Sequence, residues 1–196
     1  MIEVRIHGRQ GQGVLATAEL LAIAASMGGL SAQASPEFTA DRVEGEVVAS
    51  CRLGGAGEHG VDALIVADAG LLDHVLDGLP EDGYLLVNSG QRIDNLGLPP
   101  LALRPERAIT VPATEIARKL IGQPCLDATL AGGFAALTRA VSLDSVLAAV
   151  LQRFPGKAGR TSAAAAVTTF GVVRDELEDL VHPTVRRSSA RGRTTA

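Results

Sequence analysis

The sequence is short of aromatic residues and of cysteine. Only 3% of its 196 residues are aromatic, none is tryptophan, and the two cysteines are Cys51 and Cys125. Two distant thiols cannot supply the four thiolates that an iron–sulfur cluster or an all-cysteine zinc site usually needs. We therefore expect that the chain by itself is not an electron carrier.

Long apolar runs and an excess of basic charge are also missing. The amino terminus alternates charged and apolar residues, and no run of about 18 apolar residues occurs, so we expect a soluble, cytoplasmic protein without a membrane span. The net charge is −4, and the last thirteen residues carry four arginines and no acid. The rest of the chain is thus more acidic still, which argues against nucleic-acid binding.

Hydrophobic residues make up 46% of the sequence, which is enough to form the buried core of one domain. Apolar and β-branched runs predict strands at 2–6, 30–35, 47–53, 61–68, 84–88 and 108–111, the first with one face exposed. Helices are predicted at 14–27, 69–76, 113–121, 125–140, 142–153 and 163–180, with loops at 37–46 and 156–162. This alternation predicts an α/β fold, a single three-layer αβα domain over residues 1–183 with a mostly parallel sheet. A disordered basic tail is expected at 184–196.

A glycine-rich turn follows the first strand. Residues 11–16 within it fit the pattern G-x-G-x-x-G/A, in which the backbone approaches a phosphate and a helix amino terminus faces it. The acidic residue that would hold a ribose about 20 residues further on is missing, and no Gly-Lys-Ser/Thr follows. Phosphate binding and a purely structural turn therefore both remain open.

Several other polar residues have two interpretations. Asn88 ends a buried strand, where α/β sheets bind ligands, but it also precedes Ser-Gly and fits a turn. Arg42 and Arg52 suit either anion binding or surface ion pairs. His7, directly before the turn, is either a base or a structural residue, and no Gly-x-Ser-x-Gly pattern supports a nucleophile.

The string from His7 to Ala22 includes the glycine turn and the start of the next helix. It resembles the opening of the gamma subunit, or the equivalent domain, of the pyruvate and other 2-oxoacid:ferredoxin (flavodoxin) oxidoreductases, whose turn reads Gly-Arg-Gly-Gly-Gln-Gly. The resemblance covers about residues 1–171 and continues through Pro36, Asp41-Arg42, Arg52-Leu53 and residues 62–68, 83–88, 111–117 and 130–157. The sequence departs from the family pattern at Gln10, Val43, Glu44, Asp127 and Ala164.

The resemblance implies a gamma-type subunit of a thiamine diphosphate-dependent enzyme that oxidatively decarboxylates a 2-oxoacid to an acyl-coenzyme A and passes electrons to ferredoxin. Thiamine diphosphate, Mg²⁺ and iron–sulfur clusters would lie on alpha, beta and delta-type partner chains, and the isolated chain would be inactive. No catalytic or metal-binding residue is expected here. The residues expected to contact the 2-oxoacid or coenzyme A are Gly8, Arg9, Gln10, Gly11, Gln12, Gly13, Arg42 and Asn88.

Two alternatives stay open. One is a diverged regulatory module that binds coenzyme A or a nucleotide without belonging to an oxidoreductase, which the departures at Gln10, Val43 and Glu44 favour. The other is a structural scaffold whose glycine turn is empty.

Overall fold

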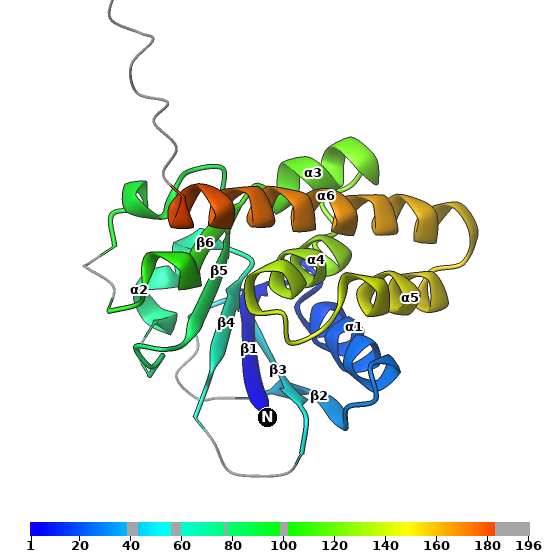
Figure 1. Ribbon diagram of the computed structural model, residues 1–196, viewed down its shortest axis with the longest axis horizontal. Coiled ribbons are helices and arrows are strands. Elements are labelled where there is room, and N and C mark those ends of the chain that lie inside the picture. The colour runs from blue at the N-terminus through cyan, green and yellow to red at the C-terminus, as the bar shows by residue number, and fades with distance from the viewer. Residues whose placement is uncertain (39–42, 56–59, 77, 99–101, 183–196) are drawn as a thin grey trace, which may run out of the picture.

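The computed structural model describes residues 1–38, 43–55, 60–76, 78–98 and 102–182 (Figure 1). Arg42 and the predicted tail at 184–196 lie outside these residues. The strands are β1 (Ile2–Arg9), β2 (Ala32–Glu37), β3 (Glu46–Leu53), β4 (Ala63–Val66), β5 (Tyr84–Asn88) and β6 (Ala108–Val111). The α-helices are α1 (Val14–Met27), α2 (Leu72–Val75), α3 (Ala113–Leu120), α4 (Asp127–Thr138), α5 (Leu143–Arg153) and α6 (Gly156–Val181). Short 3₁₀ turns are η1 (Ala69–Leu71), η2 (Ile93–Asn95) and η3 (Pro105–Arg107).

The six strands form one sheet in the order β2-β3-β1-β4-β5-β6. Strand β3 is antiparallel to both of its neighbours, while β1, β4, β5 and β6 pair in parallel. The predicted α/β fold with a mostly parallel sheet is therefore confirmed. Parallel strands require crossover connections, and helices supply most of them here.

One face of the sheet carries the main core. Figure 1 shows α1, α4 and α5 together on this side, with α6 running across α4. Helix α4 is the central helix, and eleven of its twelve residues are buried. Two glycines allow it to pack closely, because a Cβ atom at Gly132 would meet the Ala166 carbonyl of α6 and one at Gly133 would meet Leu86 of β5.

The other face of the sheet is covered unequally. Over β4 and β5 lies a smaller core to which η1 and α2 contribute Leu71, Leu72 and Val75. Over β1 and β3 the face is polar, because alternate residues of β1 pair with charged partners. The four pairs are Glu3–Arg52, Arg5–Glu37, His7–Glu46 and Arg9–Asp68.

This pairing corrects one prediction. The charged positions of the first strand, Glu3 and Arg5, were expected to face solvent, but Glu3 is only 8% exposed and Arg5 is half-buried. The alternation of charged and apolar residues reflects a central strand whose polar side chains pair with charged residues on neighbouring segments.

Two predicted boundaries are also wrong. The loop expected at 156–162 is the start of α6, because Gly159 does not break the helix but lets it approach the Phe154 carbonyl. Strand β2 does not end before Pro36 but runs through it, opposite Ala49 of β3. β2 is an edge strand, and edge strands are where a sheet tolerates proline. Within the described residues, no helix is long and apolar enough to cross a bilayer.

Candidate anion-binding site at the glycine turn

The glycine turn lies where the sheet changes direction. From β1 the chain passes through α1 to β2 on one side, whereas β4 pairs with β1 on the other side. The carboxyl ends of β1 and β4 therefore form the switch point at which open α/β sheets bind ligands. The Ala67 N–H donates to the His7 carbonyl, which holds the two strand ends together at 2.7 Å.

Glycine is required in the turn for two different reasons. Gly11 and Gly13 have positive φ angles of 87° and 75°, which other residues rarely adopt. Gly8 provides space instead, because a Cβ atom there would lie 2.8 Å from Val14 and 2.9 Å from Ala67. Gly11 and Gly13 thus shape the turn, and Gly8 lets α1 and the end of β4 approach β1.

The side chain of Gln12 fastens the turn from inside. The side-chain Oε1 accepts a hydrogen bond from the Arg9 backbone N–H at 2.7 Å. The backbone N–H of Gln12 donates to the Arg9 carbonyl at 3.1 Å. Gln12 is thus a structural clamp, and its carbonyl oxygen uses an N–H that an anion would otherwise bind. Gln10 is exposed and makes no hydrogen bond to the described residues.

The beginning of α1 presents unpaired backbone donors. Its N-cap residue is Gly13, which offers no side-chain cap. Among the described residues, no acceptor faces the backbone N–H groups of Gly11, Gly13 and Val14. Free N–H groups and the positive end of a 14-residue helix favour an anion at this position.

Arg9 is the cation of the site, but it is already engaged. Its Nε donates to Asp68 Oδ2 at 3.0 Å, and its Nη1 donates to the Glu44 carbonyl at 3.0 Å. Asp68 Oδ1 also accepts from the Gly70 N–H and so caps η1. The guanidinium is held in place at the end of β4, and Nη2 has no partner among the described residues.

Asn88 links three elements. Its Nδ2 donates to the Ala67 carbonyl at 2.8 Å and to Thr114 Oγ1 at 2.9 Å, and its Oδ1 accepts from the Thr114 N–H at 3.1 Å. It therefore joins the ends of β4 and β5 to the first turn of α3. A ligand that uses Asn88 must displace one of these bonds.

His7 and Glu46 form a buried pair beside Arg9. The two side chains meet at 2.7 Å through Nδ1 and Oε1, and Glu46 Oε2 accepts from the Val43 N–H at 3.1 Å. Because a carboxylate only accepts, Nδ1 carries the proton of the neutral ring. Burial lowers the pKa of His7, although Glu46 opposes the shift. Its Nε2 is buried without a hydrogen-bond partner among the described residues.

Asp127 stands behind the turn as the first residue of α4. Asp127 is 2% exposed, and a Cβ atom added at Gly13 would lie 3.4 Å from the Cβ atom of Asp127. Its Oδ1 accepts from the Ala128 N–H at 2.7 Å and from the Cys125 thiol at 3.3 Å. The carboxylate thus satisfies the start of α4 and places negative charge next to the turn.

The structure brings most of the predicted residues together. Residues 8–13 and Asn88 lie at the carboxyl ends of β1 and β5, the two strands that flank β4. Arg52 is elsewhere, because its Nε pairs at 2.9 Å with Glu3 near the beginning of β1, in an ion pair whose carboxylate is buried and whose arginine is exposed. Sequence reasoning missed the pairing of Arg9 with Asp68, although Asp68 follows a buried strand and was available as a signal.

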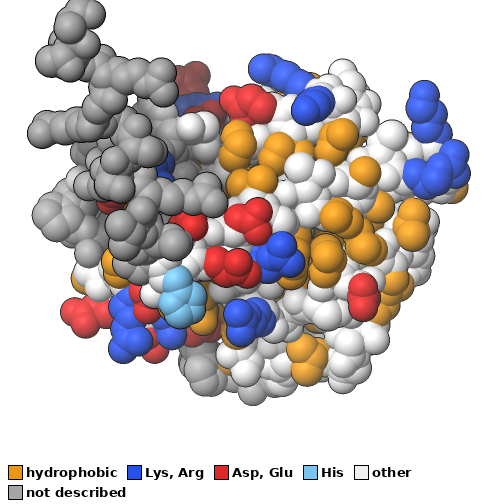
Figure 2. All heavy atoms as spheres, turned by 45° about the horizontal axis from the view of Figure 1, so that its top comes forward, with side chains coloured by type: hydrophobic (Ala, Val, Ile, Leu, Met, Phe, Trp, Pro, Cys, Tyr) orange, Lys and Arg blue, Asp and Glu red, His pale blue; other side chains and the backbone are white. Residues whose placement is uncertain are grey.

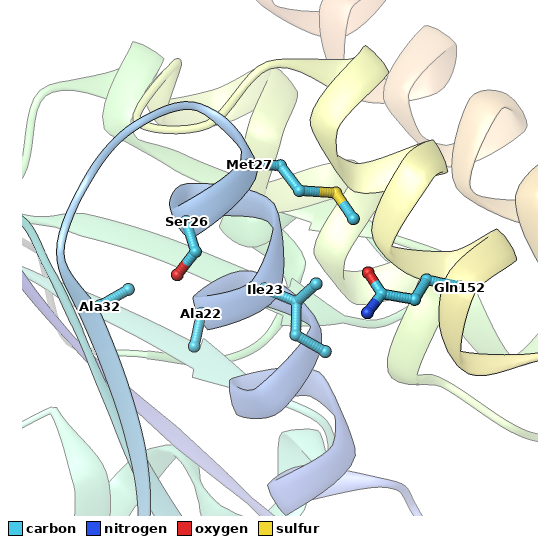
Figure 3. Close-up of a pocket in the computed structure, with 6 residues that line it drawn as sticks. All are labelled: Ala22, Ile23, Ser26, Met27, Ala32 and Gln152. Carbon is cyan, nitrogen blue, oxygen red and sulfur yellow. The ribbon is translucent and has the colours of Figure 1, made fainter.

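A hollow of about 510 Å³ lies away from the turn, between α1, β2 and α5 (Figure 3). Ile23 and Met27 of α1 and Gln152 of α5 extend toward it from two sides. No charged side chain lines it, so it does not extend the anion site. Among the described residues, no group of three or more His, Cys, Asp or Glu side chains is placed to hold a metal ion.

Solved structures share this fold. A pyruvate oxidoreductase subunit PorC from Thermotoga maritima superposes with a TM-score of 0.72 at 28% identity, covering 87% of this chain and 95% of that chain. A 2-oxoglutarate:ferredoxin oxidoreductase from Magnetococcus marinus superposes with a TM-score of 0.68 at 13% identity, covering 89% of this chain and 31% of that one, and shows the fold alone. The fold and the turn therefore define an α/β domain of the kind found in 2-oxoacid oxidoreductases.

Sequence comparison gives the family. Residues 3–172 match the family described as pyruvate ferredoxin/flavodoxin oxidoreductase. The pyruvate synthase subunit PorC of Methanothermobacter marburgensis is 36% identical over 174 residues, which cover 85% of this chain and 94% of that protein. The pyruvate/ketoisovalerate oxidoreductases common subunit gamma of Thermococcus litoralis is 34% identical, with 87% and 96% covered. The chain belongs to the pyruvate ferredoxin/flavodoxin oxidoreductase family, as its sequence predicted.

Proposed function

We propose that the chain is the gamma-type subunit of a cytoplasmic, thiamine diphosphate-dependent 2-oxoacid:ferredoxin oxidoreductase. The observation that carries the proposal is the alignment with separate subunits named for pyruvate synthase and for pyruvate/ketoisovalerate oxidoreductases, which it matches over 94% and 96% of their length. The reaction is the oxidative decarboxylation of a 2-oxoacid to an acyl-coenzyme A, with electrons passed to ferredoxin.

The partners are alpha, beta and delta-type chains that carry the cofactors. Thiamine diphosphate supplies the chemistry that breaks the bond to the departing carboxylate. Residues 1–38, 43–55, 60–76, 78–98 and 102–182 include no cluster of ligands fit for Mg²⁺, and Cys51 is fully buried. In this proposal the domain at residues 1–183 acts next to these groups, and the basic segment at 184–196 follows it.

The glycine turn has a binding role in this proposal. Its free N–H groups and the Nη2 of Arg9 bind a carboxylate or phosphate of the 2-oxoacid or coenzyme A at a subunit boundary. Asp68 and Asp127 limit the total charge that the site accepts, because each places a carboxylate beside the turn. The site therefore suits one anionic group better than a cluster of phosphates.

One face of the molecule exposes apolar side chains that a partner chain could cover. Figure 2 shows this face, with hydrophobic side chains gathered on its right half, where α5 and the beginning of α6 lie, and charged side chains toward its edges. Leu151 of α5 and Val167 of α6 are 50% and 45% exposed. Contiguous exposed apolar residues of this kind are typical of permanent subunit interfaces.

Affinity capture of the tagged chain from its native host under anaerobic conditions tests the proposal. The retained chains are identified by mass spectrometry, and 2-oxoacid-dependent reduction of a viologen dye is assayed. We expect chains with thiamine diphosphate and ferredoxin-type motifs, together with activity. If the chain returns alone and binds coenzyme A or an adenine nucleotide, it is the diverged regulatory module instead, and if it returns alone and binds neither, it is a scaffold.

A further inference from the structure

A second cluster of positive charge lies at the opposite edge of the sheet. Tyr84 is the first residue of β5 and Arg107 directly precedes β6, so both mark the amino ends of strands. With Arg104 and Arg139 they line a cavity of about 320 Å³, beneath the last turns of α6. We call this the arginine cavity. It shares no residue with the glycine turn, and the proposed function does not use it.

Arg139 adopts an unusual backbone conformation in this cavity. It follows the last residue of α4 with a φ angle of 57°, and in the described part of the chain no other non-glycine residue has a positive φ. Glycine or asparagine normally occupies such a position, because a side chain there costs about 1–2 kcal/mol. The Arg139 guanidinium makes no hydrogen bond or ion pair with the described residues. The left-handed conformation ends α4, because the Arg139 N–H donates to the Ala135 carbonyl at 3.0 Å, and it leaves the exposed Arg139 side chain lining the cavity without a partner among the described residues.

Arg107, which lines the same cavity, is held in a fixed orientation. Its guanidinium stacks over the Tyr84 ring, with Cζ 4.5 Å from the ring centroid, and its Nη1 donates to the Asp82 carbonyl. Stacking fixes the plane of the guanidinium, so little side-chain freedom is lost when an anion binds. Arg104, at the N-cap of η3, is exposed and has no partner among the described residues.

The lining of the cavity limits the ligand. Three guanidinium groups face one carboxylate, Glu106, which leaves an excess of positive charge. The remaining lining is largely apolar, with Leu137 and Leu177 among its members. The volume is at the lower end of the range of about 300–1,000 Å³ for small-molecule sites.

We propose that the arginine cavity binds a small dianionic metabolite, whose carboxylate or phosphate oxygens are held by Arg104, Arg107 and Arg139. Carboxylates and phosphates both match the planar guanidinium fork, so the ligand class is defined by its two negative charges and not by which of these groups carries them. The hydrocarbon part of the ligand lies against the leucines of α4 and α6. A bound anion would also tie η3 to the end of α4.

Titration of the full chain with inorganic phosphate, pyrophosphate or succinate at low ionic strength tests this site. Amide shifts are followed by NMR, and we expect saturable changes at Tyr84, Arg107 and Arg139 with at least one probe. Comparing the affinities for phosphate and pyrophosphate with the affinity for succinate shows whether the site prefers a phosphate or a dicarboxylate. Saturable binding elsewhere, or no saturable binding of any probe, overturns the proposal.

Variants make the test specific. Arg139→Gly removes the guanidinium but suits the positive φ, so the fold is kept while affinity falls about tenfold or more. Arg104→Gln should give a similar loss. Arg118→Ala, an exposed arginine on α3 that does not line the cavity, is the matched control and should bind as the wild type does. Unchanged affinity in Arg139→Gly would refute the site.

Discussion

Gly132 of α4 lies directly against Ala166 of α6, so closely that a Cβ atom on the glycine would be 2.3 Å from the alanine carbonyl oxygen. Real Cβ atoms do not approach an oxygen so closely. The contact therefore sets how near the two helices come, and through α4 it sets the position of Asp127 behind the glycine turn.

Gly132→Ala should destabilise the protein. The added methyl group must push α4 and α6 apart, which costs about 1–3 kcal/mol in the free energy of unfolding. Urea unfolding monitored by circular dichroism measures the change. Gly171→Ala is the control, because Gly171 lies within α6 with open space around it and should gain about 0.5–1 kcal/mol. Equal effects of the two substitutions would contradict the packing argument.

Gly11→Ala should separate binding from stability at the turn. The position has a φ of 87° and open space, so alanine costs about 1–2 kcal/mol of backbone strain and carries its methyl group into the region where an anion would approach. In the assembled enzyme we expect a higher KM for the 2-oxoacid or for coenzyme A, measured by viologen reduction.

The matched control for this substitution is Gly122→Ala. Gly122 has a φ of 89°, also with open space, but it lies after α3 and away from the turn. It should lose the same stability and keep both KM values. A turn that binds nothing would make the two variants kinetically alike.

His7 should make the protein less stable in mild acid. Burial lowers its pKa below the ordinary value of 6.5, so the unfolded chain takes up a proton before the folded one does. The stability that His7 contributes is present above 6.5 and is lost as the pH falls from there through the lowered pKa. The loss cannot exceed about 1.4 kcal/mol per pH unit for one proton.

Unfolding free energies at about pH 7.5 and about pH 5.5 measure this dependence. His7→Asn should reduce the difference between the two values, even if it lowers both. The charged groups that face the ring, Arg5, Glu37 and Glu46, are unchanged in this variant, so the comparison isolates the contribution of His7. His74→Asn, at an exposed position on α2, should retain the wild-type difference.

Cys125 should react slowly with alkylating agents. Burial raises the pKa of its thiol to about 11, and the Asp127 carboxylate adds to the shift. At about pH 8 only about one thiol in a thousand is then ionised. Asp127→Asn removes the negative charge and should speed alkylation by iodoacetamide, followed by mass spectrometry. Rapid reaction in the wild type would show that the thiol is not held as described.

Local sequence was sufficient for the first part of the site. The strand, the glycines and the helix at residues 2–27 are consecutive, so their pattern alone predicts both the turn and its free N–H groups. Pairs across long sequence distances were not predictable in this way. Arg9 and Asp68 are 59 residues apart, and His7 and Glu46 are 39 apart. Only the strand order brings them together.

Composition also misled where one residue type has two uses. Gly159 suggested a loop, because glycine is a weak helix former. In α6 its missing side chain makes room for the Phe154 carbonyl, so packing outweighs propensity. The same ambiguity applied to Asn88, whose amide is used for joining strands to α3.

Pro36 has a consequence for how the chain meets other molecules. An exposed edge strand invites another strand to add to the sheet, and this is a common route to aggregation. Proline lacks the backbone N–H that such growth needs, and the Arg5–Glu37 ion pair places charge beside it. This arrangement discourages misassembly by strand addition at β2.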